Sequence, residues 1–132
     1  MALRALLVDD SPTARGVIAR TVQQLGCEVV GLASDGREAV DMYKRLKPDF
    51  VTMDIVMPQM GGEEALKEIR AFDPAAVVIV VSSLGMMKKV LDCVKAGASY
   101  YLVKPFSSEK LKEVLAKRFP ESFPASGGGL TP

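Results

Sequence analysis

Five short apolar runs alternate along the chain with five segments of helical period, and this alternation constrains the fold more than any other feature. The runs cover residues 3–8, 29–33, 50–53, 77–81 and 100–103. They are almost continuously apolar, as strands buried on both faces of a parallel sheet are. Strict alternation of strand and helix predicts right-handed crossovers that place helices on both faces. The sequence therefore predicts an α/β fold, a doubly wound five-stranded parallel sheet.

The segments between the runs carry apolar residues at the i, i+3, i+4, i+7 spacing of a helix with one buried face. These stripes lie within 14–25, 39–46, 65–69, 86–94 and 111–115. The fourth stripe consists of Met86, Met87, Val90, Leu91 and Val94. We expect all five of these side chains to face the core.

The pattern of runs and stripes stops at residue 119. The last segment contains Pro120, Pro124 and three consecutive glycines at 127–129. Such a composition gives a chain little apolar surface to bury. We expect one domain over residues 1–118 and a disordered tail or linker stub over 119–132.

Cysteine and histidine usage excludes several classes of site. The chain has no histidine and only two cysteines, Cys27 and Cys93, without a CxxC motif. Zinc sites and histidine-based catalysis are therefore excluded. Two separate thiols are typical of a reduced, cytosolic protein. No apolar run approaches the roughly 20 residues that cross a bilayer. We expect a cytoplasmic protein that does not bind membranes.

Side chains suited to phosphoryl chemistry stand at the carboxyl ends of four predicted strands. Asp9 and Asp10 follow the first, Asp54 the third, Ser82 the fourth and Lys104 the fifth. Taken singly, each is an ordinary cap, loop or solvated residue, but ligands of open parallel sheets bind beyond these ends. Three neighbouring carboxylates repel one another, and Mg²⁺ bound by oxygen ligands relieves that repulsion. One carboxylate can then attack a phosphoryl group whose charge the metal and an ammonium neutralise.

The sequence resembles the receiver domains of two-component response regulators over roughly residues 3–118. Four segments stand in the order and spacing of that family: Leu6-Leu7-Val8-Asp9-Asp10-Ser11, Met53-Asp54-Ile55-Val56-Met57-Pro58, Val80-Val81-Ser82-Ser83 and Val103-Lys104-Pro105-Phe106. The resemblance implies a flavodoxin-like (βα)5 fold with strand order 2-1-3-4-5, the order known for chemotaxis receivers. It implies a receiver domain over 1–118, of the single-domain chemotaxis type.

The resemblance also implies a role for each acidic residue. Asp54 is the expected phosphoacceptor. Asp10 is expected to bind Mg²⁺ directly and Asp9 through a water molecule. Asp54 itself and the backbone carbonyl of Val56 complete the expected metal ligands.

Four further residues take roles from the same resemblance. Ser82 is expected to donate a hydrogen bond to the phosphoryl group, and Lys104 to pair with it. The Lys104–Pro105 peptide bond is expected to be cis. Tyr101 matches the aromatic residue that moves inward when Ser82 is drawn toward the phosphate.

The implied partners are proteins. A sensor histidine kinase or a histidine phosphotransfer protein, or else a small phosphodonor, would supply the phosphoryl group. Residues 83–118 carry eight Lys/Arg and three Asp/Glu. The implied output surface, formed by the fourth helix, fifth strand and fifth helix, is therefore expected to bind an acidic patch on a downstream target. We expect no direct binding to nucleic acid and no enzyme activity beyond self-phosphorylation and self-dephosphorylation.

Three alternatives remain open from the residues alone. A Mg²⁺-dependent aspartyl phosphatase of the haloacid dehalogenase type also uses an aspartate nucleophile, but it carries Asp-x-Asp, and residue 56 is valine. An FMN carrier needs a hydroxyl-rich phosphate loop after the first strand, where Asp9 and Asp10 would repel phosphate. The third alternative is an interaction module with a vestigial site.

The sequence departs from the family pattern at two places. Gly61-Gly62 stands where Asp or Asn often precedes the glycine, so the helix beginning near Glu63 is expected to lack a side-chain cap. Val56 and Leu84 stand two residues after the acceptor and the hydroxyl residue, where polar side chains can orient an attacking water. We expect a long-lived phosphorylated form.

Overall fold

The computed structural model describes residues 2–57 and 59–123, which form alternating strands and helices. The strands are β1 (Arg4–Val8), β2 (Glu28–Ala33), β3 (Phe50–Asp54), β4 (Val78–Ser82) and β5 (Tyr100–Val103). The helices are α1 (Pro12–Gln24), α2 (Gly36–Leu46), α3 (Gly62–Phe72), α4 (Met87–Lys95) and α5 (Ser108–Arg118). Each predicted run matches an observed strand to within one residue at either end. Across the described ranges, no helix combines the length and apolar character that crossing a membrane requires.

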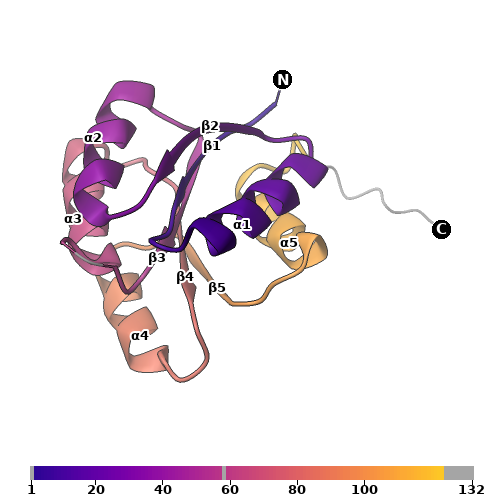
Figure 1. Ribbon diagram of the computed structural model, residues 1–132. Helices are drawn as coiled ribbons and strands as arrows, with labels where there is room; N and C mark the ends of the chain where they lie inside the picture. The colour runs from indigo at the N-terminus through magenta and orange to yellow at the C-terminus, as the bar shows by residue number, and fades with distance from the viewer. Residues whose placement is uncertain (1, 58, 124–132) are drawn as a thin grey trace.

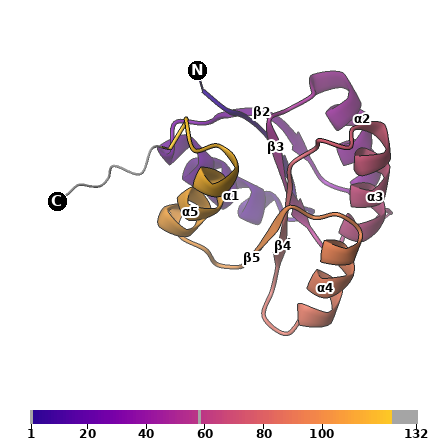
Figure 2. The same cartoon turned by 180° about the vertical axis from the view of Figure 1, so that it is seen from behind.

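The strands form one parallel sheet in the order β2-β1-β3-β4-β5, which confirms the predicted fold class. Helices α2, α3 and α4 cover one face, and α1 and α5 cover the other (Figures 1 and 2). From β1 the next strand, β2, is added on one side, whereas β3, β4 and β5 are added on the other, so the strand order reverses between β1 and β3. The carboxyl ends of these two neighbouring strands therefore lie side by side, where such folds bind ligands.

Alternate residues of the central strands supply two separate cores. Leu6 and Met53 belong to the core beneath α2, α3 and α4, whereas Leu7 and Phe50 belong to the core beneath α1 and α5. All four side chains are at most 1% exposed. Because both faces are covered, these strands need continuous apolar character, which explains the pattern in the sequence.

The expected stripe on α4 is wrong for three of its residues. Val90 is buried, but Met87, Leu91 and Val94 are 49%, 53% and 46% exposed. The other buried residue of α4 is Cys93, which does not belong to the expected stripe. The apolar residues spread over an arc of the helix wider than its contact with the sheet, so part of the arc faces outward.

The packed chain continues past the expected domain boundary at residue 118. Phe119 packs against the core beneath α1 and α5, with its ring centroid 6.4 Å from that of Phe50, and Phe123 is 9% exposed in the same core. Two phenylalanines four residues apart supply apolar surface that the proline, serine and glycine content of this segment conceals. The rest of the expected tail, residues 124–132, lies outside the described residues.

Candidate functional site

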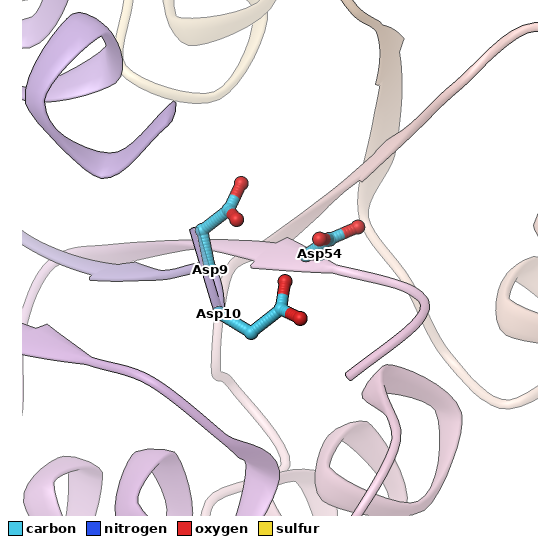
Figure 3. A group of neighbouring side chains, drawn as sticks. All are labelled: Asp9, Asp10 and Asp54. Carbon is cyan, nitrogen blue, oxygen red and sulfur yellow. The ribbon is translucent and has the colours of Figure 1, made fainter. Parts of the chain in front are cut away.

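Three carboxylates meet where the ends of β1 and β3 lie side by side. Asp9 and Asp10 directly follow β1, and Asp54 is the last residue of β3. One oxygen atom from each lies within 4.8 Å of the others, and Figure 3 shows the three side chains around one space. The structure thus brings together the three acidic residues that the sequence singled out.

Asp9 is buried and held from several sides. Its Oδ1 accepts a hydrogen bond of 2.9 Å from the backbone N–H of Ser11, and its Oδ2 accepts one of 2.8 Å from Nζ of Lys104. Its backbone carbonyl accepts a third, of 2.7 Å, from Nη1 of Arg15. Both carboxylate oxygens are therefore already engaged, which suits an indirect role toward a cation.

Asp10 differs from its neighbour in both burial and bonding. It is exposed, whereas Asp9 is 1% exposed. Among the described residues, its carboxylate has no hydrogen-bond partner within the protein. Asp10 is accordingly the carboxylate most open to direct coordination.

Lys104 reaches the acidic cluster from the end of β5. Its Nζ lies 2.8 Å from Asp9 Oδ2 and 3.4 Å from Asp54 Oδ2. Its backbone N–H donates to the carbonyl of Ser82, at 2.7 Å, and the peptide bond to Pro105 is cis. Ser82 is 3% exposed at the end of β4. The ammonium of Lys104 therefore lies beside Asp54, and Ser82 ends the neighbouring strand β4.

Burial and the surrounding charges shift the pKa values of two groups in this cluster. Burial raises the pKa of Asp54, and the charge of Asp9 adds to this, while Lys104 opposes it without cancelling it. Burial by itself would lower the pKa of Lys104, but its hydrogen bond to Asp9 and the charges of Asp54 and Asp9 leave that pKa raised. In the metal-free site, three carboxylates thus have the single ammonium of Lys104 beside them.

The donor set fits Mg²⁺. The three carboxylates offer hard oxygen ligands, and among the described residues no sulfur or nitrogen ligand joins their cluster. A divalent cation would also offset both the burial and the charge of Asp9, which together raise the pKa of Asp54. Asp9, Asp10 and Asp54 are the side chains able to hold it.

The remaining predicted residues lie at the edges of the site. Val56 follows Asp54 by two positions, and its side chain is 53% exposed. Tyr101 is 44% exposed and pairs with Val80 in the ladder between β4 and β5. Ser82 lies two residues beyond Val80 on the same face of β4, so Ser82 and Tyr101 share the face that α4 covers.

Sequence reasoning missed two residues that shape the site. Arg15 fixes the Asp9 carbonyl from the first turns of α1. Gly62 begins α3 so close to β3 that an added Cβ would lie 2.3 Å from the carbonyl oxygen of Asp54. The available signals were a basic residue five positions after Asp10 and the Gly61-Gly62 pair.

Known proteins similar to this chain agree with the geometry. The family model described as the response regulator receiver domain matches residues 5–116. The chemotaxis protein CheY of Thermotoga maritima is 47% identical over 117 residues, covering 89% of this chain and 98% of that protein. CheY of Bacillus subtilis is 44% identical, with the same shares covered.

Two solved structures carry the same fold. One is the CheX–CheY–BeF3–Mg²⁺ complex from Borrelia burgdorferi, with a TM-score of 0.83, 36% identity and 89% of each chain covered. The other is the receiver domain of a sensor histidine kinase from Pseudomonas aeruginosa, with magnesium coordinated in its active site cleft. Its TM-score is 0.81 at 31% identity, over 89% of this chain and 97% of that one.

Proposed function

We propose that this chain, which belongs to the response regulator receiver family and is a phosphorylation-dependent signalling switch, accepts its phosphoryl group on Asp54. The observation that carries the assignment is that this carboxylate lies within 4.8 Å of Asp10, which is open to a cation, and 3.4 Å from Nζ of Lys104. Asp54 is also the carboxylate of the three whose pKa is raised, mainly by burial and further by the charge of Asp9. Neither the family model nor the two CheY relatives favours the aspartyl phosphatase alternative.

The metal site we propose consists of Asp10 and Asp54 as direct ligands, Asp9 through water, and the backbone carbonyl of Val56. Bound Mg²⁺ would neutralise charge that develops on the transferred phosphoryl group. The free carboxylate of Asp10 and the engaged carboxylate of Asp9 support this division of roles. Arg15 keeps the Asp9 carbonyl in place beside them.

In the proposed transfer, an oxygen of Asp54 forms a bond to phosphorus while the bond from phosphorus to the donor breaks. The leaving group is an imidazole of a phosphohistidine, or acetate when acetyl phosphate is the donor, and it departs with the electron pair. Lys104, already 3.4 Å from Asp54, is placed to bind a phosphoryl oxygen. Ser82, buried at the end of β4, would donate to another oxygen.

The proposed switch connects Ser82 to Tyr101. Both side chains lie on the face of the sheet beneath α4, and Tyr101 is exposed in this structure. If the Ser82 hydroxyl moves toward the phosphoryl group, it vacates space on that face. Tyr101 would then turn inward and change the surface formed by α4, β5 and α5.

This output surface is apolar as well as basic. Met87, Leu91 and Val94 are exposed on α4. A groove of about 890 Å³, lined in part by Val94, Tyr101, Lys110 and Lys117, runs along β5 toward α5. We propose a downstream protein that offers both acidic and apolar side chains to this surface.

The proposed setting is chemotaxis, because CheY proteins recur among the similar sequences. A sensor histidine kinase or a histidine phosphotransfer protein would supply the phosphoryl group in the cytoplasm. We propose no catalytic activity beyond the gain and loss of the chain's own phosphoryl group.

Incubation with acetyl phosphate and Mg²⁺ tests the assignment. Intact mass should increase by one phosphoryl group, which base should remove because an acyl phosphate is base-labile. Asp54→Asn should abolish the increase, while Asp41→Asn, at an exposed position of α2, should not change it. Labelling of Asp54→Asn at the wild-type rate would refute the assignment.

A further inference from the structure

Gly36, the first residue of α2, touches the segment that joins β3 to α3, residues 55–61. The N–H of Gly36 donates a hydrogen bond of 2.9 Å to the backbone carbonyl of Met60. A Cβ at position 36 would lie 2.3 Å from that carbonyl oxygen and 2.8 Å from both Cβ and Cγ of Met60. Only glycine leaves room for this contact.

The first residue of α3 holds the other end of the same segment. The N–H of Gly62 donates to the carbonyl of Ile55, also at 2.9 Å. A Cβ at Gly62 would lie 2.3 Å from the carbonyl oxygen of Asp54. In both cases an N–H from the start of a helix, which has no partner within that helix, binds a carbonyl of the segment.

Two described residues of this segment, Gln59 and Met60, are also held in place. Met60 is 5% exposed and belongs to the core beneath α2, α3 and α4. Gln59 has a φ of 67°, a left-handed conformation that persists in a residue other than glycine only where its surroundings impose it. Val56, whose carbonyl is the proposed backbone ligand of Mg²⁺, lies between the two contacts in sequence.

We propose that Gly36 is a positioning residue for the Mg²⁺ site, acting through the carbonyl of Met60. A side chain at position 36 would displace Met60, and with it the segment that presents the Val56 carbonyl. Gly36 neither binds the metal nor belongs to the output surface of α4, β5 and α5. The inference rests on the proposed metal ligands.

The test compares Gly36→Ala with a matched Gly16→Ala control. A Cβ at Gly16, within α1, would meet only the end of the Arg20 side chain, at 4.0 Å. NMR titration with MgCl2, without phosphodonor, gives the dissociation constant of each folded variant. Loss of a group that orients a ligand weakens metal binding by about tenfold or more. We expect that loss for Gly36→Ala and wild-type affinity for Gly16→Ala.

The outcomes separate this inference from the function on which it rests. A wild-type protein that does not bind Mg²⁺ would remove the proposed metal site itself. If the wild type binds Mg²⁺ and Gly36→Ala binds it with the same dissociation constant, the positioning role of Gly36 is wrong and the proposed metal site stands.

A measurement on the wild-type protein covers the case in which Gly36→Ala does not fold. The amide of Glu38 lies in the same turn of α2 but donates a hydrogen bond of 2.8 Å to the side chain of Asp35, not to the segment after β3. It therefore serves as an internal control. Saturation with Mg²⁺ should shift the Gly36 amide resonance and leave that of Glu38 in place. An unshifted Gly36 amide, or equal shifts of the two amides, would contradict the proposal.

Discussion

Removing the exposed carboxylate of the cluster should stabilise the metal-free protein. Asp10 has an oxygen atom within 4.8 Å of one from Asp9 and one from Asp54. Among the described residues no ammonium or guanidinium pairs with it, since Lys104 pairs with the other two. Asp10→Asn therefore removes repulsion and breaks no side-chain hydrogen bond or ion pair among the described residues.

The distance gives the size of the effect. Two unit charges 4.8 Å apart repel by about 3.5 kcal/mol at an effective dielectric constant of 20 and by about 0.9 kcal/mol in water. Because Asp10 is exposed, the lower value applies to each of its two pairs, and Lys104 weakens the field of Asp9 further. We expect the free energy of unfolding to rise by about 1 kcal/mol.

Urea denaturation in EDTA and in Mg²⁺ measures this effect. Without metal, Asp10→Asn should be more stable than the wild type, whereas the charge-matched Asp41→Asn should not be. At about 100 times its dissociation constant, Mg²⁺ should stabilise the wild type by about 2.7 kcal/mol and the weaker-binding variant by less, so the order of stability reverses. A metal-free Asp10→Asn protein less stable than wild type would refute the picture of a crowded acidic cluster.

Three further predictions concern single features of the site. Burial raises the folded-state pKa of Asp54, so the folded protein holds this proton more tightly than the unfolded chain. As pH falls through that raised value toward about 3.9, the metal-free wild type should gain stability relative to Asp54→Asn in urea titrations, and parallel curves would contradict this. Gly61→Asn should stabilise by about 0.5–1 kcal/mol, because a side chain at this uncapped helix start meets only the Ile55 carbonyl at 3.5 Å. Gly62→Ala should instead destabilise by about 1–3 kcal/mol, and similar melting temperatures for the two variants would count against this contrast. Val56→Asn combined with Leu84→Glu should speed phosphate release by about tenfold, because these polar groups can orient the attacking water; unchanged release kinetics would show that the lifetime is set elsewhere.

The sequence was sufficient to predict the sheet and the residues at its rim. Strands buried on both faces need continuous apolar runs, which separate them clearly from amphipathic helices. The position of a residue at the carboxyl end of its strand then follows from chain order alone. Asp9, Asp10, Asp54 and Lys104 meet because parallel strands place those ends at one edge.

The contacts of the glycines could not be predicted in the same way. Gly36 and Gly62 are the first residues of α2 and α3. At the start of a helix, the sequence pattern gives no sign of a contact that requires glycine. Their importance comes from backbone carbonyls of the segment after β3, which approach to distances that a Cβ would prevent. Such an approach depends on how the helices are placed over the sheet, and no local pattern encodes that placement.

The apolar arc of α4 was misassigned because periodicity identifies apolar faces without identifying what covers them. Val90 and Cys93 satisfy the packing of this helix on the sheet, so Met87, Leu91 and Val94 are not needed for the core. Three exposed apolar side chains on one helix favour association over solubility. Val94 lines the groove that contains Tyr101, and all three lie on α4, part of the surface that the proposed switch would alter. Their exposure is therefore better explained by binding of a partner than by the stability of the fold. The basic residues nearby would mainly increase the association rate with that partner.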